Sequence, residues 1–349
     1  MSDFHTLKVS KIDKNTPNSV IITFAVPGNL MRDFAFKAGQ YLTIKHTIEG
    51  KEVRRAYSIC SAPHDKVLQV GVKKVDGGAF SVYANESLKD GDTLEVMPPQ
   101  GKFIVNPEKD NAKNYAAFAA GSGITPILSI IEAVMEDEPD SKFLLVYGNQ
   151  TRENTMFYDA IMKLKQKNPQ RFFPNFIYSR SREDNARFGR IDRSIVNYYL
   201  KNEFEYTVFD AFYVCGPEPM IDEVSSTLKE NGINEKAIHF ELFKTSEGGL
   251  LVESHDGTTN ISIIIDDETT TFNMSQEKSV LDAALEKKLD APYSCQGGIC
   301  STCIARIVEG KAEMRKNQIL TDGEIAEGLI LTCQAHPTTA TLTVDYDDV

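Results

Sequence analysis

Apolar and polar residues alternate over short runs in residues 1–106, and glycine or proline separates many of these runs. Alternation with a period of two residues is typical of β-strands that bury one face. The pattern predicts five strands, at Ser19–Val26, Tyr41–Thr47, Val53–Cys60, Val67–Val75 and Thr93–Val96. Only Phe80–Leu88 has a helical pattern here. Residues 1–106 are therefore expected to form an antiparallel β-barrel.

Longer apolar runs alternate with amphipathic stretches in residues 107–243. The runs are Tyr115–Ala120, Phe143–Tyr147, Phe172–Tyr178 and Ala211–Cys215. The helical stretches are the segment from Gly123 through Met135 and the segments Thr155–Lys167, Asp192–Lys201 and Pro219–Asn231. Strands that alternate with helices predict a doubly wound parallel α/β sheet, which binds its ligands at the carboxyl ends of the strands.

Residues 244–258 show no clear period and are interpreted as a linker. A third domain is expected in residues 259–349. Its predicted elements are strands at Ile261–Ile265 and Thr270–Met274, a helix at Ser279–Lys288, and strands at Ile304–Val308 and Thr341–Tyr346.

Charge and hydropathy narrow the class of protein. The formal net charge of −12 argues against a nucleic-acid-binding protein, which needs a basic face. Residues 259–349 carry 7 Lys and Arg against 15 Asp and Glu, so this module suits docking to a basic partner. No run resembles a signal peptide or a membrane span. A cytoplasmic protein without membrane insertion is expected, in which clustered cysteines indicate metal binding and not disulfides.

Four of the six cysteines form the most specific motif. Cys295, Cys300 and Cys303 have the spacing C-x4-C-x2-C, and Cys333 follows at a distance. This spacing is typical of plant-type [2Fe–2S] clusters, whose irons are held by four thiolates. A structural zinc site is the alternative, although zinc is usually held by two close pairs of ligands.

Two glycine turns precede predicted helices, at Gly77-Gly78-Ala79-Phe80-Ser81 and Gly121-Ser122-Gly123-Ile124-Thr125-Pro126. Backbone N–H groups at a helix N-terminus can bind phosphate. Each turn alone is a weak signal, because tight turns use glycine for packing as well. The segment Ser179-Arg180-Ser181-Arg182 could bind a 2′-phosphate or simply face solvent. Motifs of hydrolases and phosphoryl-transfer enzymes are not found.

Taken in order, these motifs resemble the ferredoxin–NADP reductase superfamily. The likeness covers nearly the whole chain and is greatest to oxygenase reductases with a C-terminal ferredoxin domain, a group that includes phenylacetyl-CoA epoxygenase reductases. The motifs that carry it are Arg55-Ala56-Tyr57-Ser58, Gly78–Ser81, Gly121–Pro126, Cys215-Gly216-Pro217 and the cysteine loop. The resemblance implies an FAD-binding barrel (1–106), an NAD(P)-binding domain (107–243) and a β-grasp [2Fe–2S] domain (259–349).

The resemblance also implies roles for single residues. Arg55 and the turn Gly78–Ser81 would hold the flavin diphosphate, Tyr57 would pack on the isoalloxazine, and Ser58 would lie near N5. Cys215 would lie beside the nicotinamide C4, and Phe243 would cover the other face of the flavin. Classical family members end on a tyrosine at that point, so Phe243 departs from the pattern.

The expected activity is electron transfer from NAD(P)H through the flavin to the cluster and on to an oxygenase or another acceptor protein. The pair Ser179-Arg180 matches a family motif and favours NADPH over NADH, which some relatives prefer. FAD is expected, although some relatives with this domain order use FMN. The alternatives are a general ferredoxin-type reductase for a cytochrome or desaturase, and a zinc-binding or redox-sensing module.

Overall fold

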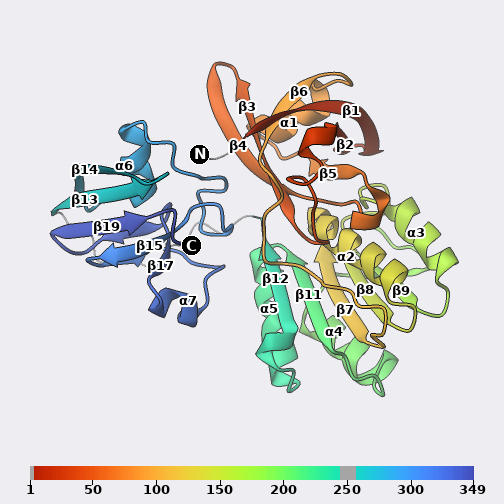
Figure 1. Cartoon of the computed structure of the whole chain (residues 1–349). Helices are drawn as coiled ribbons and strands as arrows, with labels where there is room; N and C mark the ends of the chain where they lie inside the picture. Colours follow the sequence, from red (N-terminus) through yellow and green to blue (C-terminus); the bar gives the residue numbers. More distant parts are fainter. Residues whose placement is uncertain (1–3, 244–256) are drawn as a thin grey trace. The chain divides into compact units, whose positions relative to one another are not determined.

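A computed structural model describes residues 4–243 and 257–349, which form two compact units (Figure 1). Residues 5–53 and 57–243 make up one unit, and residues 257–349 with Phe4 and residues 54–56 make up the other. The predicted linker falls mostly on residues 244–256, outside the described chain, whereas Thr258 begins a strand. Across the described ranges, no helix has the length and apolarity that crossing a bilayer requires.

The first sheet has six antiparallel strands in the order β4-β3-β6-β1-β2-β5. They are β1 (His5–Thr16), β2 (Ser19–Ala25), β3 (Tyr41–Ile48), β4 (Lys51–Ser58), β5 (Leu68–Lys73) and β6 (Thr93–Val96). An isolated bridge pairs Ile59 with Val70 and so joins the end of β4 to β5, the other edge of the sheet. The sheet is therefore barrel-like, as predicted. Its helix α1 (Ala79–Glu86) packs beside β3 and β5.

Strand β1 is absent from the prediction, which places no strand before Ser19. Irregularities in its pairing with β2 occur between Val9 and Lys11 and between Lys14 and Thr16. Each irregularity shifts the side chains to the opposite face, so the period of two is lost along the sequence. Leu7 and Val9 are nevertheless fully buried in the barrel core.

The second sheet is parallel, with the order β10-β9-β8-β7-β11-β12. Its strands are β7 (Asn114–Ala120), β8 (Lys142–Asn149), β9 (Phe172–Tyr178), β10 (Ala186–Phe188), β11 (Ala211–Gly216) and β12 (Ile238–Leu242). The chain runs from β7 outward to β10, then returns to β11 on the other side of β7. The order therefore reverses between β7 and β11, which is where doubly wound sheets bind their ligands. The short strands β10 and β12 were not predicted.

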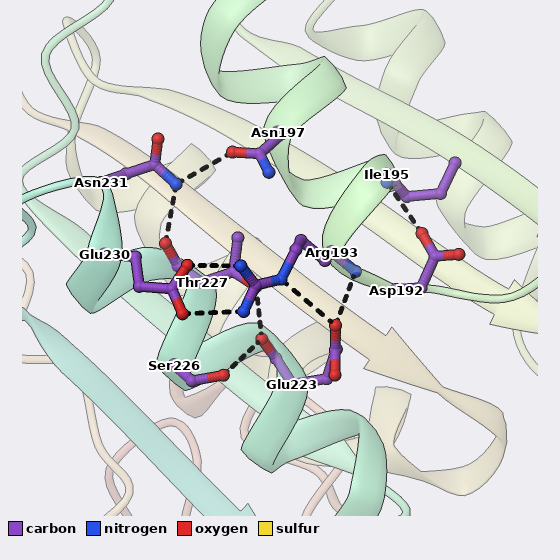
Figure 2. Close-up of polar contacts among 9 residues, drawn as sticks. All are labelled: Asp192, Arg193, Ile195, Asn197, Glu223, Ser226, Thr227, Glu230 and Asn231. Atoms are coloured by element: carbon purple, nitrogen blue, oxygen red, sulfur yellow. Dashed lines mark hydrogen bonds and ion pairs between the residues drawn. The ribbon is translucent and has the colours of Figure 1, made fainter.

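Helices α2 (Ile124–Asp137) and α3 (Tyr158–Lys167) share one core with residues of β7, β8, β9 and β11. Helices α4 (Arg193–Tyr198) and α5 (Glu218–Glu230) pack on each other, and α5 also packs on β11 and β12. Figure 2 shows the polar contacts between them: the Arg193 guanidinium donates to both oxygens of Glu230, at 2.6 and 2.7 Å. These side chains are about half exposed, so the pair contributes little to stability.

Close packing joins the barrel to the nucleotide domain within the first unit. A Cβ on Gly71 of β5 would lie 2.8 Å from Cγ2 of Thr125 in α2, so a larger residue there would have to displace this side chain. The Asn15 side chain accepts a hydrogen bond from the backbone N–H of Phe157, and the Ser129 hydroxyl donates to the Ser61 carbonyl at 2.6 Å. The two domains therefore form one compact body.

The second unit contains a five-stranded sheet in the order β14-β13-β19-β15-β17, together with helix α6 (Val280–Glu286). The strands are β13 (Thr258–Ile265), β14 (Glu268–Ser275), β15 (Ile304–Glu309), β17 (Leu329–Leu331) and β19 (Thr341–Asp345). Strand β17, the small pair β16 (Ala312–Met314) and β18 (Ala335–Pro337), and helix α7 (Asp322–Ala326) were not predicted. Helix α7 has a capping box between Thr321 and Glu324, a signal that the sequence contains.

Asp266 and Asp267 connect β13 to β14 in a two-residue turn, because Ile265 pairs with Glu268. Both have positive φ angles, 54° and 62°, as in a type I′ turn. Their backbone N–H groups donate to the two carboxylate oxygens of Asp347, at 3.0 and 2.8 Å. These bonds, first that of Asp267, lower the pKa of Asp347. The residues after β19 thus hold the first hairpin of this unit.

Glu132 of α2 is a partly buried carboxyl group at the junction between the barrel and the nucleotide domain. Burial, and then the Asp65 carboxylate, raises its pKa from 4.5 to about 7, and Lys167 acts in the opposite direction. The folded protein therefore keeps this proton up to about pH 7, whereas the unfolded chain loses it near pH 4.5. Stability from this group is present below pH 4.5 and is lost as the pH rises through about 7.

We expect Glu132→Gln to remove this pH dependence, because glutamine resembles the protonated acid. At about pH 8 the variant should be more stable than the parent by about 1–2 kcal/mol, and at about pH 5 the two should be similar. Denaturant unfolding at both pH values measures this, with the exposed Glu136→Gln on the same helix as control. Equal stability of parent and Glu132→Gln at the higher pH would contradict the assignment.

We expect Asp267→Gly to stabilise the protein by about 0.5–1 kcal/mol, because glycine adopts a positive φ without steric cost. The backbone N–H that bonds to Asp347 is kept. Asp347→Ala should change stability in the opposite direction, since it removes the acceptor of both turn amides. Unfolding of the second unit, followed by far-ultraviolet circular dichroism, distinguishes these signs.

Candidate functional site

The first glycine turn packs against Ser81, in the first turn of the helix α1 that follows it. Gly77 has a φ of 71°, and a Cβ on Gly78 would lie 2.5 Å from the Ser81 hydroxyl. That hydroxyl accepts a hydrogen bond from the Val75 N–H at 3.1 Å and donates to the Gly78 carbonyl at 3.3 Å. The side chain of Phe80, the residue before Ser81, is buried. The two bonds of the Ser81 hydroxyl make the turn at the N-terminus of α1 compact. Such a turn can accept phosphate.

Strand β4 carries the motif Arg55-Ala56-Tyr57-Ser58 along its last residues. Arg55 is exposed and Ser58 is buried, while Ala56 and Tyr57 are partly exposed. The Tyr57 ring lies 5.4 Å from the ring of Phe80, centroid to centroid. The structure therefore brings the aromatic residue of this motif beside the helix that follows the first glycine turn.

The second glycine turn and Cys215 meet at the point where the strand order reverses. Gly121–Gly123 follows β7 directly and leads into α2. A Cβ on Gly123 would overlap the carbonyl oxygen of Cys215. On Gly216, a Cβ would lie 2.7 Å from the Met220 side chain. Pro217 then serves as the N-cap of α5. The two sequence motifs are thus parts of one site.

Ser58 and Cys215 are joined through Glu241, a residue that the sequence analysis missed. Cys215 and Glu241 are register partners on β11 and β12, and the Ser58 hydroxyl donates to Glu241 Oε2 at 3.1 Å. Burial, and then the Glu241 carboxylate, raises the pKa of the Cys215 thiol, which therefore stays protonated. A carboxylate between the apolar residues Phe240 and Leu242 of this short strand was the available signal. Phe243 follows this strand and packs on the core that contains Cys215.

Lys73 is a second residue that the sequence analysis missed. It ends β5, and its Nζ lies 3.3 Å from the position that a Cβ on Gly121 would take. Burial lowers the pKa of this ammonium group. Among the residues that the structure describes, no carboxylate forms an ion pair with it. A half-buried cation thus lies beside a glycine turn at a helix N-terminus, an arrangement suited to a diphosphate. Thr125 and Pro126 of the same motif are buried in the first turn of α2.

The arginines after β9 fall into two groups. The backbone N–H groups of Ser179 and Arg180 donate to the carbonyls of Asn149 and Gln150, so this segment continues along the end of β8. The Arg180 side chain is exposed. By contrast, Arg182 stacks on Phe188 at 4.6 Å and Arg187 on Tyr198 at 3.7 Å. Ser179 and Arg180 therefore lie at the carboxyl edge of the sheet, where ligands bind.

The four remaining site cysteines lie together in the second unit. Cys300, Cys303 and Cys333 are buried, and Cys295 is partly exposed. The Cys295 thiol lies close enough to those of Cys300 and Cys333, and the Cys333 thiol to that of Cys303, for each neighbour to influence its pKa. None of them is in a disulfide. The four thiols thus lie near one another although Cys333 is remote in sequence.

The loop that carries these cysteines has the backbone that a cluster requires. The Gly297 N–H points at Cys295 Sγ at 3.4 Å, and a Cβ on Gly298 would lie 2.7 Å from the Lys316 carbonyl. Gln296 has a positive φ of 52°, and its carbonyl accepts from the Gln334 side chain. In the described ranges, no three His, Cys, Asp or Glu side chains are placed to hold one metal ion. A dinuclear cluster divides four thiolates between two irons, and this donor set fits it.

Three domain families match the chain in succession. An oxidoreductase FAD-binding domain matches residues 6–104, an oxidoreductase NAD-binding domain matches residues 118–226, and a 2Fe-2S iron-sulfur cluster binding domain matches residues 263–338. These matches confirm the predicted flavin, nicotinamide and iron–sulfur domains and their order. They do not distinguish NADPH from NADH.

Whole-chain comparisons agree with this order. The chain is 40% identical to one of the polypeptides of the 1,2-phenylacetyl-CoA epoxidase of Escherichia coli (strain K12), over 99% of each chain. It is 30% identical to the ferredoxin reductase component of 3-ketosteroid-9-alpha-monooxygenase of Rhodococcus rhodochrous, over 97% of this chain and 96% of the relative. The fold matches phthalate dioxygenase reductase with a TM-score of 0.59 and 23% identity, over 98% of each chain. By its domains and its relatives, the chain belongs to the ferredoxin–NADP reductase-type oxygenase reductases, which pass electrons through FAD and a [2Fe–2S] cluster.

Proposed function

We propose that this chain is the reductase component of a 1,2-phenylacetyl-CoA epoxidase. The observation that carries the proposal is the 40% identity to the Escherichia coli epoxidase polypeptide over 99% of both chains. The 30% identity to a 3-ketosteroid-9-alpha-monooxygenase reductase supports the general role but not the same partner. A flavin takes two electrons from a nicotinamide as hydride, and a [2Fe–2S] cluster accepts electrons one at a time. The chain's residues bind and orient these groups.

On the flavin side, we propose that Arg55 and the turn Gly78–Ser81 bind the diphosphate, and that Tyr57 packs on the isoalloxazine. The compact turn at the N-terminus of α1 supports the first assignment, and the position of Tyr57 beside Phe80 supports the second. Phe243 is proposed to cover the opposite face of the flavin. Its packing on the core that contains Cys215 supports this role.

At the reacting atoms, we propose that Ser58 lies near flavin N5 and Cys215 near the nicotinamide C4. Glu241 supports both assignments, because it accepts a hydrogen bond from Ser58 and is the register partner of Cys215. The Ser58 proton then points to Glu241, which leaves the lone pairs of the Ser58 oxygen for the cofactor side. The Cys215 thiol stays neutral there, so it offers van der Waals contact without charge.

For the nicotinamide dinucleotide, we propose that the turn Gly121–Gly123 and Lys73 bind the diphosphate. Ser179 and Arg180 are proposed to bind the 2′-phosphate, which makes NADPH the preferred donor. The exposure of Arg180 at the carboxyl edge of the sheet supports this, whereas Arg182 and Arg187 are already stacked on aromatic rings. Cys295, Cys300, Cys303 and Cys333 are proposed to hold the cluster.

Reconstitution tests the partner. The purified holoprotein, mixed with the oxygenase components of the phenylacetyl-CoA epoxidase, should support epoxide formation that depends on NADPH and phenylacetyl-CoA. Cys300→Ser should reduce this activity at least about a hundredfold, because removal of one thiolate ligand disrupts the cluster. Ferricyanide reduction, which takes electrons from the flavin, should remain within about twofold. Epoxide formation by Cys300→Ser at the parent rate would refute the role of the cluster.

If the holoprotein reduces cytochrome c but supports no epoxide formation, the partner assignment is wrong and the family assignment stands. The 3-ketosteroid monooxygenase oxygenase component is the comparison partner, since its reductase is 30% identical to this chain. Equal support of both oxygenases would indicate a general reductase.

The two proposed phosphate contacts predict different specificities. Lys73→Met should raise KM for NADPH and NADH by a similar factor, about tenfold, because both donors carry the diphosphate. Arg180→Ala should raise KM for NADPH about tenfold and leave KM for NADH unchanged. Steady-state ferricyanide reduction with each donor measures both ratios. An unchanged NADPH-to-NADH ratio in Arg180→Ala would remove Arg180 from the 2′-phosphate site.

A further inference from the structure

Tyr147 is a fully buried residue whose only polar side-chain atom reaches the second glycine turn. It lies on β8 as the register partner of Ala119 of β7, two residues before the turn begins. Its ring belongs to the core beneath α2, and its hydroxyl donates to the Gly121 carbonyl at 2.8 Å. The core packing needs only the ring. The hydroxyl makes its hydrogen bond to the glycine turn.

A second hydroxyl engages the next carbonyl of the turn. The Thr125 side chain, in the first turn of α2, donates to the Ser122 carbonyl at 2.9 Å. Gly121 has a φ of 56°, which few other residues adopt without strain. Two successive carbonyl oxygens of the turn are thus held by protein hydroxyls. The conformation of the turn is set by its own neighbours before any ligand arrives.

The direction of the backbone N–H groups follows from these two bonds. In a trans peptide the carbonyl and the N–H point in opposite directions. Because the Gly121 carbonyl points to Tyr147, the Ser122 N–H points away from the core. The Ser122 carbonyl points to Thr125, and the Gly123 N–H points away from it for the same reason. Amides arranged in this way at a helix N-terminus bind anions.

We propose that Tyr147 is a positioning residue for the nicotinamide dinucleotide, whose hydroxyl orients the Gly121–Ser122 peptide so that the Ser122 N–H donates to the diphosphate. The proposal rests on the proposed binding of the diphosphate at this turn. Without the hydroxyl, the Gly121 carbonyl loses its donor and the peptide is free to rotate. Binding of the dinucleotide must then fix the orientation of this peptide again, which lowers the affinity for the dinucleotide. The reacting atoms stay in place.

The proton of the Tyr147 hydroxyl remains in place over the working pH range. Burial raises the pKa of this phenol, so it acts as a donor at neutral and at alkaline pH. The effect of losing the hydroxyl is therefore the same under mildly acidic and mildly alkaline conditions. A purely structural weakening of the core has no reason to appear in KM alone.

The test compares Tyr147→Phe with Tyr115→Phe in the holoprotein. Tyr115 is a buried tyrosine of the same core, and its hydroxyl donates to the Glu138 carboxylate in a separate set of contacts. Tyr147→Phe loses the bond to Gly121, Tyr115→Phe loses the contacts with both oxygens of Glu138, and both variants keep the ring. Tyr147→Phe should raise KM for NADPH and NADH about three- to tenfold, with kcat within about twofold. Tyr115→Phe should leave both KM values unchanged, and the flavin and cluster spectra should match the parent in both.

Thr125→Val supplies an independent second variant, because it removes the hydroxyl that holds the Ser122 carbonyl and keeps the shape of the side chain. It should also raise both KM values. An equal rise of KM in Tyr115→Phe and Tyr147→Phe would overturn the proposal, since the effect would then come from the core. Unchanged KM in Tyr147→Phe with raised KM in Lys73→Met would overturn the role of Tyr147 alone. Unchanged KM in both would overturn the proposed diphosphate site as well.

Discussion

The close approach of the second glycine turn to strand β11 is the constraint on which the nicotinamide side of the molecule depends. Gly123 lies against the carbonyl of Cys215, so closely that a side chain on it would overlap that atom. This contact forms where the strand order reverses, and the start of α2 lies directly beyond it. A single methyl group at Gly123 would therefore displace the turn, the end of β11, or both. The two motifs are coupled through backbone atoms.

Polar contacts extend this arrangement from the nucleotide domain to the barrel. Glu241 accepts a hydrogen bond from Ser58, and the Asn15 side chain accepts one from the Phe157 N–H. Lys73 approaches the glycine turn from the barrel side. Tyr57 and Ser58 of the flavin motif are thus held in one body with the nicotinamide motif by contacts that each domain supplies to the other. Their relative position does not depend on a flexible connection.

Local patterns explain why much of the fold could be predicted from the sequence. Strand β9 was predicted to the residue, because Phe172–Tyr178 is rich in aromatic residues and has the polar residues Arg171 and Ser179 on its two sides. The cysteine spacing pointed to the iron–sulfur domain that the family comparison confirms. Strand β1 was missed because bulges break its alternation, and β16 and β18 because three residues are too few to show a period.

The missed site residues have a different cause. Glu241 and Ser58 are separated by 183 residues, and their hydrogen bond exists only after β12 has joined the parallel sheet beside the barrel. Lys73 of the barrel likewise lies near Gly121, which belongs to the nucleotide domain, only in the folded protein. The pattern of apolar and polar residues around Glu241 or Lys73 does not indicate which residues lie near them in the folded chain. Short motifs therefore marked the glycine turns that we propose bind the cofactors, while the side chains that lie beside these turns required the three-dimensional structure.

The position of β19 in the sheet has a consequence for biosynthesis. It lies at the centre of the five-stranded sheet, between β13 and β15, and it pairs in parallel with β13. All four cysteines of the second unit precede it in the chain. On the ribosome, these thiols are therefore translated before the strand that completes their sheet, and non-local pairing of this kind forms slowly. The core that contains Cys303 and Cys333 is thus complete only after Leu342 and Val344 of β19 have been translated.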